Sequence, residues 1–116
     1  MKHEEHYIQS TFVQWFRLNH KRHIVYAVPN GDKRSMLTAV RLKKEGVLAG
    51  VPDLHILLDN GKSFFLEIKT EKGKLNKNQK STISEIEKRG YAVLVCYGID
   101  DIIKQVNDTI NNYLQI

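Results

Sequence analysis

Apolar side chains recur every three or four positions in four stretches of the chain, which is the spacing of a helix that packs on one side. In the first stretch, Ile8, Phe12 and Phe16 form one apolar stripe. This period and the stop signals around it predict four helices: Glu4 to about Asn19, Ser35 (as a cap) to Gly46, Asn78 to Arg89, and Asp100 to Leu114. Trp15 and Phe16 are expected to pack in the core rather than to stack on bases.

Four shorter segments have the composition of strands. They run from His23 to Val28, from Asp53 to Leu58, from Ser63 to Lys69 and from Tyr91 to Tyr97. The last is a continuous apolar run, so we expect it to be buried on both faces of a sheet. The order α-β-α-β-β-α-β-α over residues 1–116 predicts a single α/β domain with a mixed central sheet flanked by helices.

The second and third strands are separated by Asp59-Asn60-Gly61-Lys62, a strong signal for a hairpin. Side chains on a strand alternate between faces, so the apolar residues at 54, 56 and 58 and those at 64, 66 and 68 form one buried face. Asp53 and His55 then share the opposite face with Glu67 and Lys69.

The length of the turn decides which residues of this hairpin face each other. A two-residue turn would set Asp53 opposite an apolar residue, on the wrong face. A three-residue turn from Asp59 to Gly61 sets Asp53 opposite Glu67 and uses Gly61 as the left-handed residue of the turn. We therefore predict the three-residue turn, unless a bulge near Asp53 corrects the register instead.

Two directly opposed carboxylates repel each other unless a cation lies between them. Oxygen ligands without His or Cys favour Mg²⁺ or Mn²⁺ over zinc. Beside such a metal, Lys69 would orient or deprotonate a water molecule and stabilise charge on a phosphate, so the cluster contains the parts for phosphodiester hydrolysis. The spacing alone leaves an alternative open, in which Asp53 caps a turn while Glu67 and Lys69 form a solvated surface ion pair.

The composition and the net charge indicate which class of partner the chain binds. The net charge of +5 and the pI near 9.4 favour a polyanion such as DNA. The single cysteine, Cys96, cannot form an internal disulfide, and its apolar surroundings predict a buried thiol rather than a nucleophile. Because no secretory signal and no membrane-spanning apolar run occurs, we expect a cytoplasmic protein without a membrane partner.

Several motifs occur together in one order along the chain: Glu5-His6-Tyr7-Ile8-Gln9, Pro29-Asn30-Gly31, Gly46, Gly50, Pro52-Asp53-Leu54, Glu67-Ile68-Lys69 and Gln79. In this combination the sequence resembles the PD-(D/E)xK nuclease superfamily, and in particular its stand-alone VRR-NUC branch of phage and bacterial proteins. The resemblance implies a restriction-endonuclease-like core and a metal-dependent endodeoxyribonuclease. If a phage encodes the chain, it would act in the host cytoplasm.

The resemblance also implies the metal centre. Asp53 and Glu67 would bind Mg²⁺, for which Mn²⁺ substitutes, and the carbonyl of Ile68 would add a ligand. Lys69 would serve the water that attacks the phosphate.

Two further positions match the family pattern outside this centre. Glu5 resembles the acidic residue of the first helix, which completes the metal shell, although Glu4 is adjacent to it. Gln79 resembles the glutamine that supports the active site or touches substrate. Thr82 stands where some relatives have tyrosine, so a role for that tyrosine does not transfer to this chain.

Minimal members of this branch look like Holliday-junction resolvases, which act on branched DNA as homodimers. Two identical active sites related by a two-fold axis would suit the symmetry of a four-way junction. We therefore expect a Mg²⁺-dependent, structure-specific DNA endonuclease. The alternatives are a flap or non-specific DNA nuclease and, in another class, a non-catalytic DNA-binding module that keeps the nuclease fold.

Basic residues near the catalytic motif and near the first turn would contact DNA phosphates, with a solvated surface as the alternative. The expected DNA contacts are Lys72, Lys74, Lys77, Lys80, Lys33 and Arg34. His55 shares the face of Asp53 and would either touch DNA or be a simple polar-face residue. The remaining histidines are expected to be solvated: His3, His6, His20 and His23.

Overall fold

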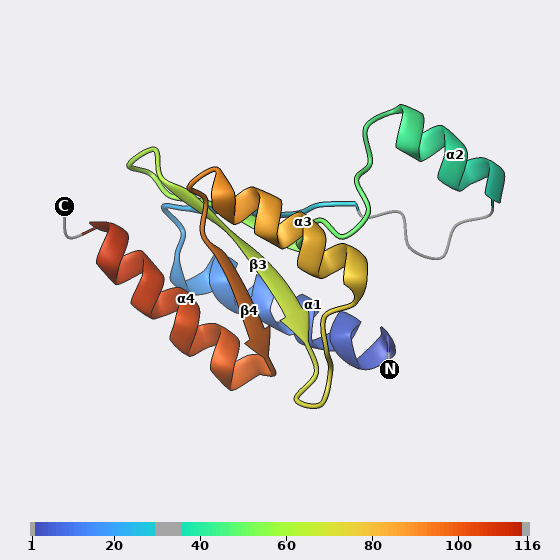
Figure 1. Ribbon diagram of the computed structural model, residues 1–116. Helices are drawn as coiled ribbons and strands as arrows, with labels where there is room; N and C mark the ends of the chain where they lie inside the picture. Colours follow the sequence, from blue (N-terminus) through green and yellow to red (C-terminus); the bar gives the residue numbers. More distant parts are fainter. Residues whose placement is uncertain (1, 30–35, 115–116) are drawn as a thin grey trace.

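The computed structural model describes residues 2–29 and 36–114, so the proposed cap Ser35 lies outside the described residues. The elements are α1 Lys2–Asn19, β1 Ile24–Ala27, α2 Met36–Lys44, β2 Leu54–Leu57, β3 Ser63–Lys69, α3 Lys77–Lys88, β4 Val93–Tyr97 and α4 Ile99–Leu114. The predicted order of helices and strands is confirmed, and the boundaries differ by at most two residues (Figure 1).

The four strands form one mixed sheet in the order β1-β2-β3-β4. β1 pairs with β2 and β2 with β3 in antiparallel fashion, whereas β3 and β4 are parallel. A parallel pair needs a long crossover connection, which α3 supplies here. The central strands β2 and β3 therefore carry partners on both edges, and their ends are held in place from both sides.

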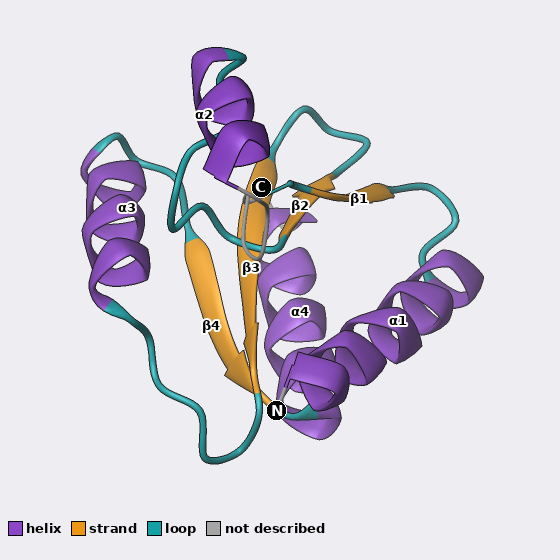
Figure 2. Ribbon diagram, turned by 90° about the vertical axis from the view of Figure 1, so that its right-hand side faces the viewer, coloured by secondary structure: helices purple, strands orange, loops and turns teal. Residues whose placement is uncertain are grey.

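The sheet lies between α3 on one side and α1 with α4 on the other (Figure 2). The predicted apolar face of the hairpin is fully confirmed, because Leu54, Ile56, Phe64 and Leu66 have no exposed surface. Side chains from α1 and α4 complete this core: Phe12, Phe16, Ile102, Val106 and Ile110. Trp15 packs against the same cluster, as predicted for the first helix.

Two parts of the fold lie away from this core. β4 is an edge strand, so the prediction that it is buried on both faces is wrong: Leu94 and Val95 are only half-buried. Its Cys96 is buried, as predicted, and burial raises the pKa of this thiol to about 12, which excludes a thiolate nucleophile at neutral pH. α2 projects away from the sheet and leaves Leu37 84% exposed (Figure 1).

The predicted three-residue turn of the β2–β3 hairpin is confirmed. Leu54 pairs with Leu66, which is the register that a three-residue turn gives. The N–H of Leu58 donates to the carbonyl of Lys62 at 2.8 Å, and Gly61 has a φ of 87°, in the left-handed region. The hairpin therefore needs no further bulge to bring its polar residues to one face.

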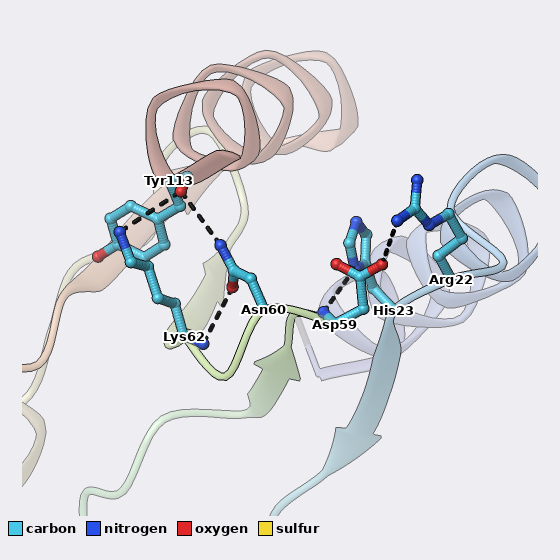
Figure 3. A network of polar contacts seen from close by, with 6 residues as sticks. All are labelled: Arg22, His23, Asp59, Asn60, Lys62 and Tyr113. Carbon is cyan, nitrogen blue, oxygen red and sulfur yellow. Dashed lines mark hydrogen bonds and ion pairs between the residues drawn. The ribbon is translucent and has the colours of Figure 1, made fainter. Parts of the chain in front are cut away.

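Contacts from the segment before β1 and from the last turn of α4 hold this turn (Figure 3). The N–H of Asp59 donates to His23 Nδ1 at 3.1 Å, and the Asp59 carboxylate pairs with Arg22 at 2.6 Å. On the other side, Asn60 Nδ2 donates to the carbonyl of Tyr113 at 3.2 Å. The turn thus joins the segment before β1 to the last turn of α4, which stabilises the hairpin register.

The expectation that His20 and His23 are solvated is wrong. The side chain of His23 is 6% exposed, and burial lowers its pKa, which keeps the ring neutral and able to accept a hydrogen bond. His20 is half-buried and donates from Nε2 to Asn107 Oδ1 at 3.0 Å. Both residues therefore connect the segment between α1 and β1 to other elements.

Among residues 2–29 and 36–114, no helix combines the length and the apolar character that a membrane crossing requires.

Replacing Phe12 by Ala is expected to lower the free energy of unfolding by about 3–5 kcal/mol, because this fully buried ring would leave a cavity. Leu18, on the same helix, is 71% exposed, and Leu18→Ala is expected to cost less than about 0.5 kcal/mol. Urea unfolding of both variants measures the difference. Similar losses would contradict the packing of α1 on the sheet.

Candidate active site

Two carboxylates face each other where β2 begins and β3 ends. The pairing of Leu54 with Leu66, continued by one residue, sets Asp53 opposite Glu67, as predicted. Asp53 is fixed at this position twice: its carbonyl accepts from the N–H of Val28 at 2.9 Å, and its Oδ2 accepts from the N–H of Ile68 at 2.7 Å.

Glu67 is the most deeply buried charged residue in the described part of the chain, with 1% of its surface exposed. Its Oε2 accepts a hydrogen bond from Gln79 Nε2 at 3.0 Å. Its Oε1 is buried and has no hydrogen-bond partner among the described residues. A buried carboxylate oxygen without a partner is costly, so this atom marks a place where a cation or a donor is needed.

The first turn of α3 determines how Gln79 points. Asn76 caps the helix by accepting from the N–H of Gln79 at 2.8 Å, and Gln79 Oε1 accepts from the N–H of Asn76 at 2.9 Å. This capping box leaves the Nε2 amide of Gln79 free to donate to Glu67. The Asn76-to-Gln79 spacing is a sequence signal for such a box, and the prediction that α3 starts at Asn78 overlooked it.

Lys69 is buried beside Glu67, with its Nζ atom 3.9 Å from Glu67 Oε2. The side chains of the two residues are 9% and 2% exposed, so the alternative of a solvated surface ion pair is wrong. α3 covers the face of the sheet that carries both residues, which the alternation pattern alone did not reveal. The structure thus brings Asp53, Glu67 and Lys69 together in a site shielded from water.

Burial and mutual repulsion set the protonation of the two carboxyls. Burial and, to a smaller extent, repulsion from Asp53 raise the pKa of Glu67 to about 8, although the charge of Lys69 acts in the opposite direction. Burial also raises the pKa of Asp53 to about 6, although the hydrogen bond from Ile68 acts in the opposite direction. Without a cation between them, the pair therefore retains a proton near neutral pH.

Glu5 lies near this pair, whereas Glu4 is exposed to solvent. The charge of Glu5 raises the pKa of both Asp53 and Glu67, which shows that its carboxylate acts on both. Two views place the start of α1 next to the carboxyl end of β3 (Figures 1 and 2). Of the two adjacent acidic residues, Glu5 is therefore the one in position to join the site.

The donor set fits a divalent cation bound by oxygen. Among the described residues, no group of three His, Cys, Asp or Glu side chains forms a ready cage. Mg²⁺ needs only one or two carboxylates, because water and substrate phosphate supply its other ligands. Glu67 Oε1 and the Asp53 carboxylate would hold it. The carbonyl of Ile68 lies on the β2 side of β3, toward Asp53, because its N–H donates to that side.

The predicted DNA contacts fall into two groups. Lys72, Lys74, Lys77 and Lys80 are exposed on the segment after β3 and on the first turns of α3, next to the site. Lys33 and Arg34 lie outside the described residues.

His55 is held within the sheet rather than directed at the carboxylates. Its Nδ1 shares a 2.7 Å hydrogen bond with the hydroxyl of Tyr26, and its ring stacks on Phe65 with the centroids 4.2 Å apart. Burial lowers its pKa and keeps the ring neutral. These contacts favour the polar-face interpretation of His55.

The loop before Asp53 docks on α3 through two contacts that the sequence prediction missed. Thr82 Oγ1 donates to the carbonyl of Ala49 at 2.7 Å. Gly50 lies so close to the helix that a Cβ atom there would be 2.2 Å from the carbonyl oxygen of Asn78. The first half of α3 therefore positions both carboxylates, Glu67 through Gln79 and Asp53 through this loop.

The substitution Gly50→Ala is expected to destabilise the fold more than Gly46→Ala. Both glycines have a positive φ, 82° and 106°, so both substitutions strain the backbone by about 1–2 kcal/mol. Only at Gly50 would the new methyl group collide with α3, because nothing lies within 4 Å at Gly46. Urea unfolding and metal titration of both variants test this expectation. Equal losses would show that the close approach of Gly50 does not position Asp53.

In metal-free buffer, Glu67→Gln is expected to gain stability relative to the wild type as the pH rises from about 4.5 to about 8. In this window the carboxyl is ionised in the unfolded chain but still protonated in the fold, so the wild type loses free energy of unfolding. The gain should be on the order of a few kcal/mol. Urea unfolding at a series of pH values measures it, and parallel curves for the two proteins would contradict the burial of this pair.

Comparisons with known proteins agree with this fold. The chain matches the VRR-NUC domain family over residues 1–100. A solved structure described as a VRR-NUC domain protein is 24% identical, with a TM-score of 0.75 over 92% of this chain and 88% of that chain. A second, described as a VRR-NUC domain, is 27% identical, with a TM-score of 0.60 over 94% of this chain and 96% of that chain. No curated protein matches. This chain therefore belongs to the VRR-NUC domain family, a family of nucleases that generally use a divalent metal.

Proposed function

We propose that this chain is a Mg²⁺-dependent, structure-specific DNA endonuclease, in which Mn²⁺ can substitute for Mg²⁺. One observation carries the proposal: Asp53 and Glu67 are opposed, Glu67 has a buried oxygen without a partner in the described part of the chain, and Lys69 is buried beside them. Such a cluster costs stability, so its presence in a folded core supports a functional role. Cleavage of DNA by the full chain, with and without divalent metal, tests the proposal.

The roles of the residues follow from their positions. Asp53, Glu67 and the Ile68 carbonyl would hold the metal, and Glu5 would complete its shell through a water molecule. The metal would supply a Lewis acid for the scissile phosphate. Gln79 fixes Glu67 Oε2, so that Oε1 stays directed away from the helix amide. As a water oxygen bonds to phosphorus and one P–O ester bond breaks, negative charge accumulates on the phosphate. The ammonium group of Lys69 would stabilise that charge, in a site from which bulk water is largely excluded.

DNA is the proposed substrate because an exposed basic surface adjoins the site. Lys72 and Lys74 follow the catalytic strand, and Lys77 and Lys80 lie on the first turns of α3. Their charges would bind phosphates on either side of the cut and would make binding sensitive to salt.

We further propose that two copies of the chain act together on branched DNA such as a Holliday junction. A two-fold dimer presents two equivalent active sites, which suits the symmetry of a four-way junction. The exposed apolar side chains of Leu37 and Val40 on the projecting helix α2 support a contact between copies. A flap or non-specific nuclease would use the same site on a different DNA. A non-catalytic module is less well supported, because it would not need two opposed carboxylates, one of them buried.

Asp53→Asn and Glu67→Gln are each expected to slow metal-dependent cleavage by at least about a hundredfold, because each removes a ligand charge from the site. Lys69→Met should still bind metal but lose about a hundredfold in cleavage rate. Lys104→Met is the matched control, since Lys104 is an exposed lysine on α4 that pairs with Asp108. Labelled four-way junction, flap, single-stranded and linear duplex DNA, each with Mg²⁺, Mn²⁺ or EDTA, are the substrates.

Full activity of the Asp53 or Glu67 variant would refute the assigned metal site, and an unchanged rate for Lys69→Met would remove its catalytic role. Preferential cutting of flaps would keep the nuclease and refute the junction preference. Tight DNA binding without cleavage of any substrate would favour the non-catalytic module.

Light scattering of the free protein is expected to give about twice the chain mass of 13.5 kDa, and the protein part of its complex with junction DNA is expected to have the same mass. A mass near that of one chain at working concentration, in both conditions, would refute the dimer.

A further inference from the structure

Tyr97 lies beside Lys69 at the carboxyl end of the sheet, and the proposed chemistry does not use it. In the parallel pairing of β3 with β4, whose ends lie side by side in Figure 2, Tyr97 is the partner of Lys69. The N–H of Gly98 donates to the carbonyl of Lys69 at 3.0 Å, which holds the two strand ends in this register. Neighbouring strands lie about 4.7–4.9 Å apart, so the backbones of the two residues are fixed at about that separation.

The side chains of Lys69 and Tyr97 lie on the same face of the sheet. Ile68 and its partner Cys96 belong to the core between the sheet and the helices α1 and α4. By alternation, the next residue of each strand points to the opposite face, which α3 covers in part. This is also the face of Glu67, whose Oε2 is 3.9 Å from Lys69 Nζ. Tyr97 thus extends the row of site residues by one strand, to the edge strand of the sheet.

Tyr97 differs from its neighbours in the site because it is open to solvent. It is 39% exposed, whereas Lys69 is 7% exposed. The loop after β3 contributes to this difference, because a Cβ atom at Gly73 would be 3.3 Å from the Cβ atom of Lys69. The hydroxyl of Tyr97 has no hydrogen-bond partner among the described residues. It is therefore available to a ligand that reaches Lys69.

The first turns of α4 hold the backbone of Tyr97. Its N–H donates to Asp101 Oδ2 at 2.8 Å. The same oxygen accepts from Gln105 Nε2 at 3.0 Å, and this amide also donates to the carbonyl of Val95 at 3.3 Å. A tyrosine side chain has few rotatable bonds, so a fixed backbone leaves its hydroxyl few positions. Such a group binds a ligand with a small loss of conformational entropy.

The charges around Tyr97 indicate an anionic ligand. Lys69 lies next to it, and the exposed Lys72 follows on the loop after β3. Glu71 is the exception, because its side chain lies against Gly98: a Cβ atom there would be 3.4 Å from Glu71 Cγ. The carboxylate disfavours a phosphate at Gly98. The position that suits a phosphate is therefore the side of Tyr97 that faces Lys69.

We propose that the hydroxyl of Tyr97 donates a hydrogen bond to a DNA phosphate next to the scissile phosphate, on the same strand. The proposal rests on the proposed nuclease function and adds a substrate-binding residue to it. Lys69 would act at the scissile phosphate, and Tyr97, one strand spacing away, would bind its neighbour. A contact to a phosphate reads no base, so it tolerates any sequence and suits the paired arms of a four-way junction.

Binding of a labelled four-way junction by the full chain is measured by fluorescence anisotropy in EDTA. Tyr97→Phe keeps the ring and is expected to weaken binding by about tenfold, because a hydrogen bond to a charged group is lost. The contacted phosphate does not react, so the contact is the same before and during cleavage. With Mg²⁺ and excess enzyme, the half-saturating enzyme concentration should therefore rise by about the same factor, and the rate at saturation should stay within about twofold.

Tyr91→Phe is the matched control. Tyr91 precedes β4 at the other end of the strand, is 53% exposed and has its ring against Phe65. The control variant also removes one exposed tyrosine hydroxyl, and it should bind the junction within about twofold of the wild type. Circular dichroism of both variants verifies folding.

A second measurement replaces single phosphates near the branch point by uncharged methylphosphonates. At the contacted phosphate, the wild type should lose more affinity than Tyr97→Phe, because the shared hydrogen bond can be lost only once. At the other positions the two proteins should lose affinity equally. Equal losses at every position would overturn the contact.

Junction binding by Tyr97→Phe at the level of Tyr91→Phe would also overturn it. Cleavage by the wild-type chain is assayed in parallel with Mg²⁺. A wild-type chain that cuts DNA, while Tyr97→Phe binds the junction normally, refutes the Tyr97 contact alone. A chain whose junction binding depends on the Tyr97 hydroxyl but which cuts no DNA supports the contact and refutes the proposed nuclease function.

Discussion

Two carboxylates that oppose each other in a shielded site impose the constraint on which the rest of this structure depends. Neutral donors hold one oxygen of each: the N–H of Ile68 holds Asp53, and the amide of Gln79 holds Glu67. Lys69, at 3.9 Å, compensates for only part of their negative charge. The remaining cost appears as the raised pKa of both carboxyls. A divalent cation between the carboxylates would remove this loss of stability, so metal binding is expected to stabilise the fold.

Packing and hydrogen bonds elsewhere in the same strands and in α3 offset the loss of stability at the two carboxylates. The apolar face of the same hairpin buries Leu54, Ile56 and Leu66 against α1 and α4 and thereby fixes the strands. On the polar face, the first half of α3 positions both acidic residues, through a capping box and through the docked loop that precedes Asp53. A helix used in this way couples the geometry of the site to the stability of α3. The site therefore depends on contacts between segments far apart in the sequence.

Local patterns in the sequence were enough to predict the order of helices and strands and part of the candidate site. Strict alternation in the hairpin predicted its buried face, and parity together with Gly61 predicted the turn that sets Asp53 opposite Glu67. The burial of Glu67 and Lys69 was not predictable in this way, because it arises when α3 folds over the sheet. The bond from Thr82 to Ala49 spans 33 residues and has no periodic signal. Similarly, His23 gives no local indication that it will accept a hydrogen bond from a turn 36 residues away.

The position of the metal tests this account most directly. Crystals soaked in Mn²⁺ and measured near its absorption edge would locate the ion by anomalous scattering, independently of any activity assay. The account predicts a peak between the Asp53 carboxylate and Glu67 Oε1, absent in the Glu67→Gln variant. A wild-type crystal without a peak at this position, or with its strongest peak elsewhere in the chain, would contradict the claim that the two carboxylates form a metal site.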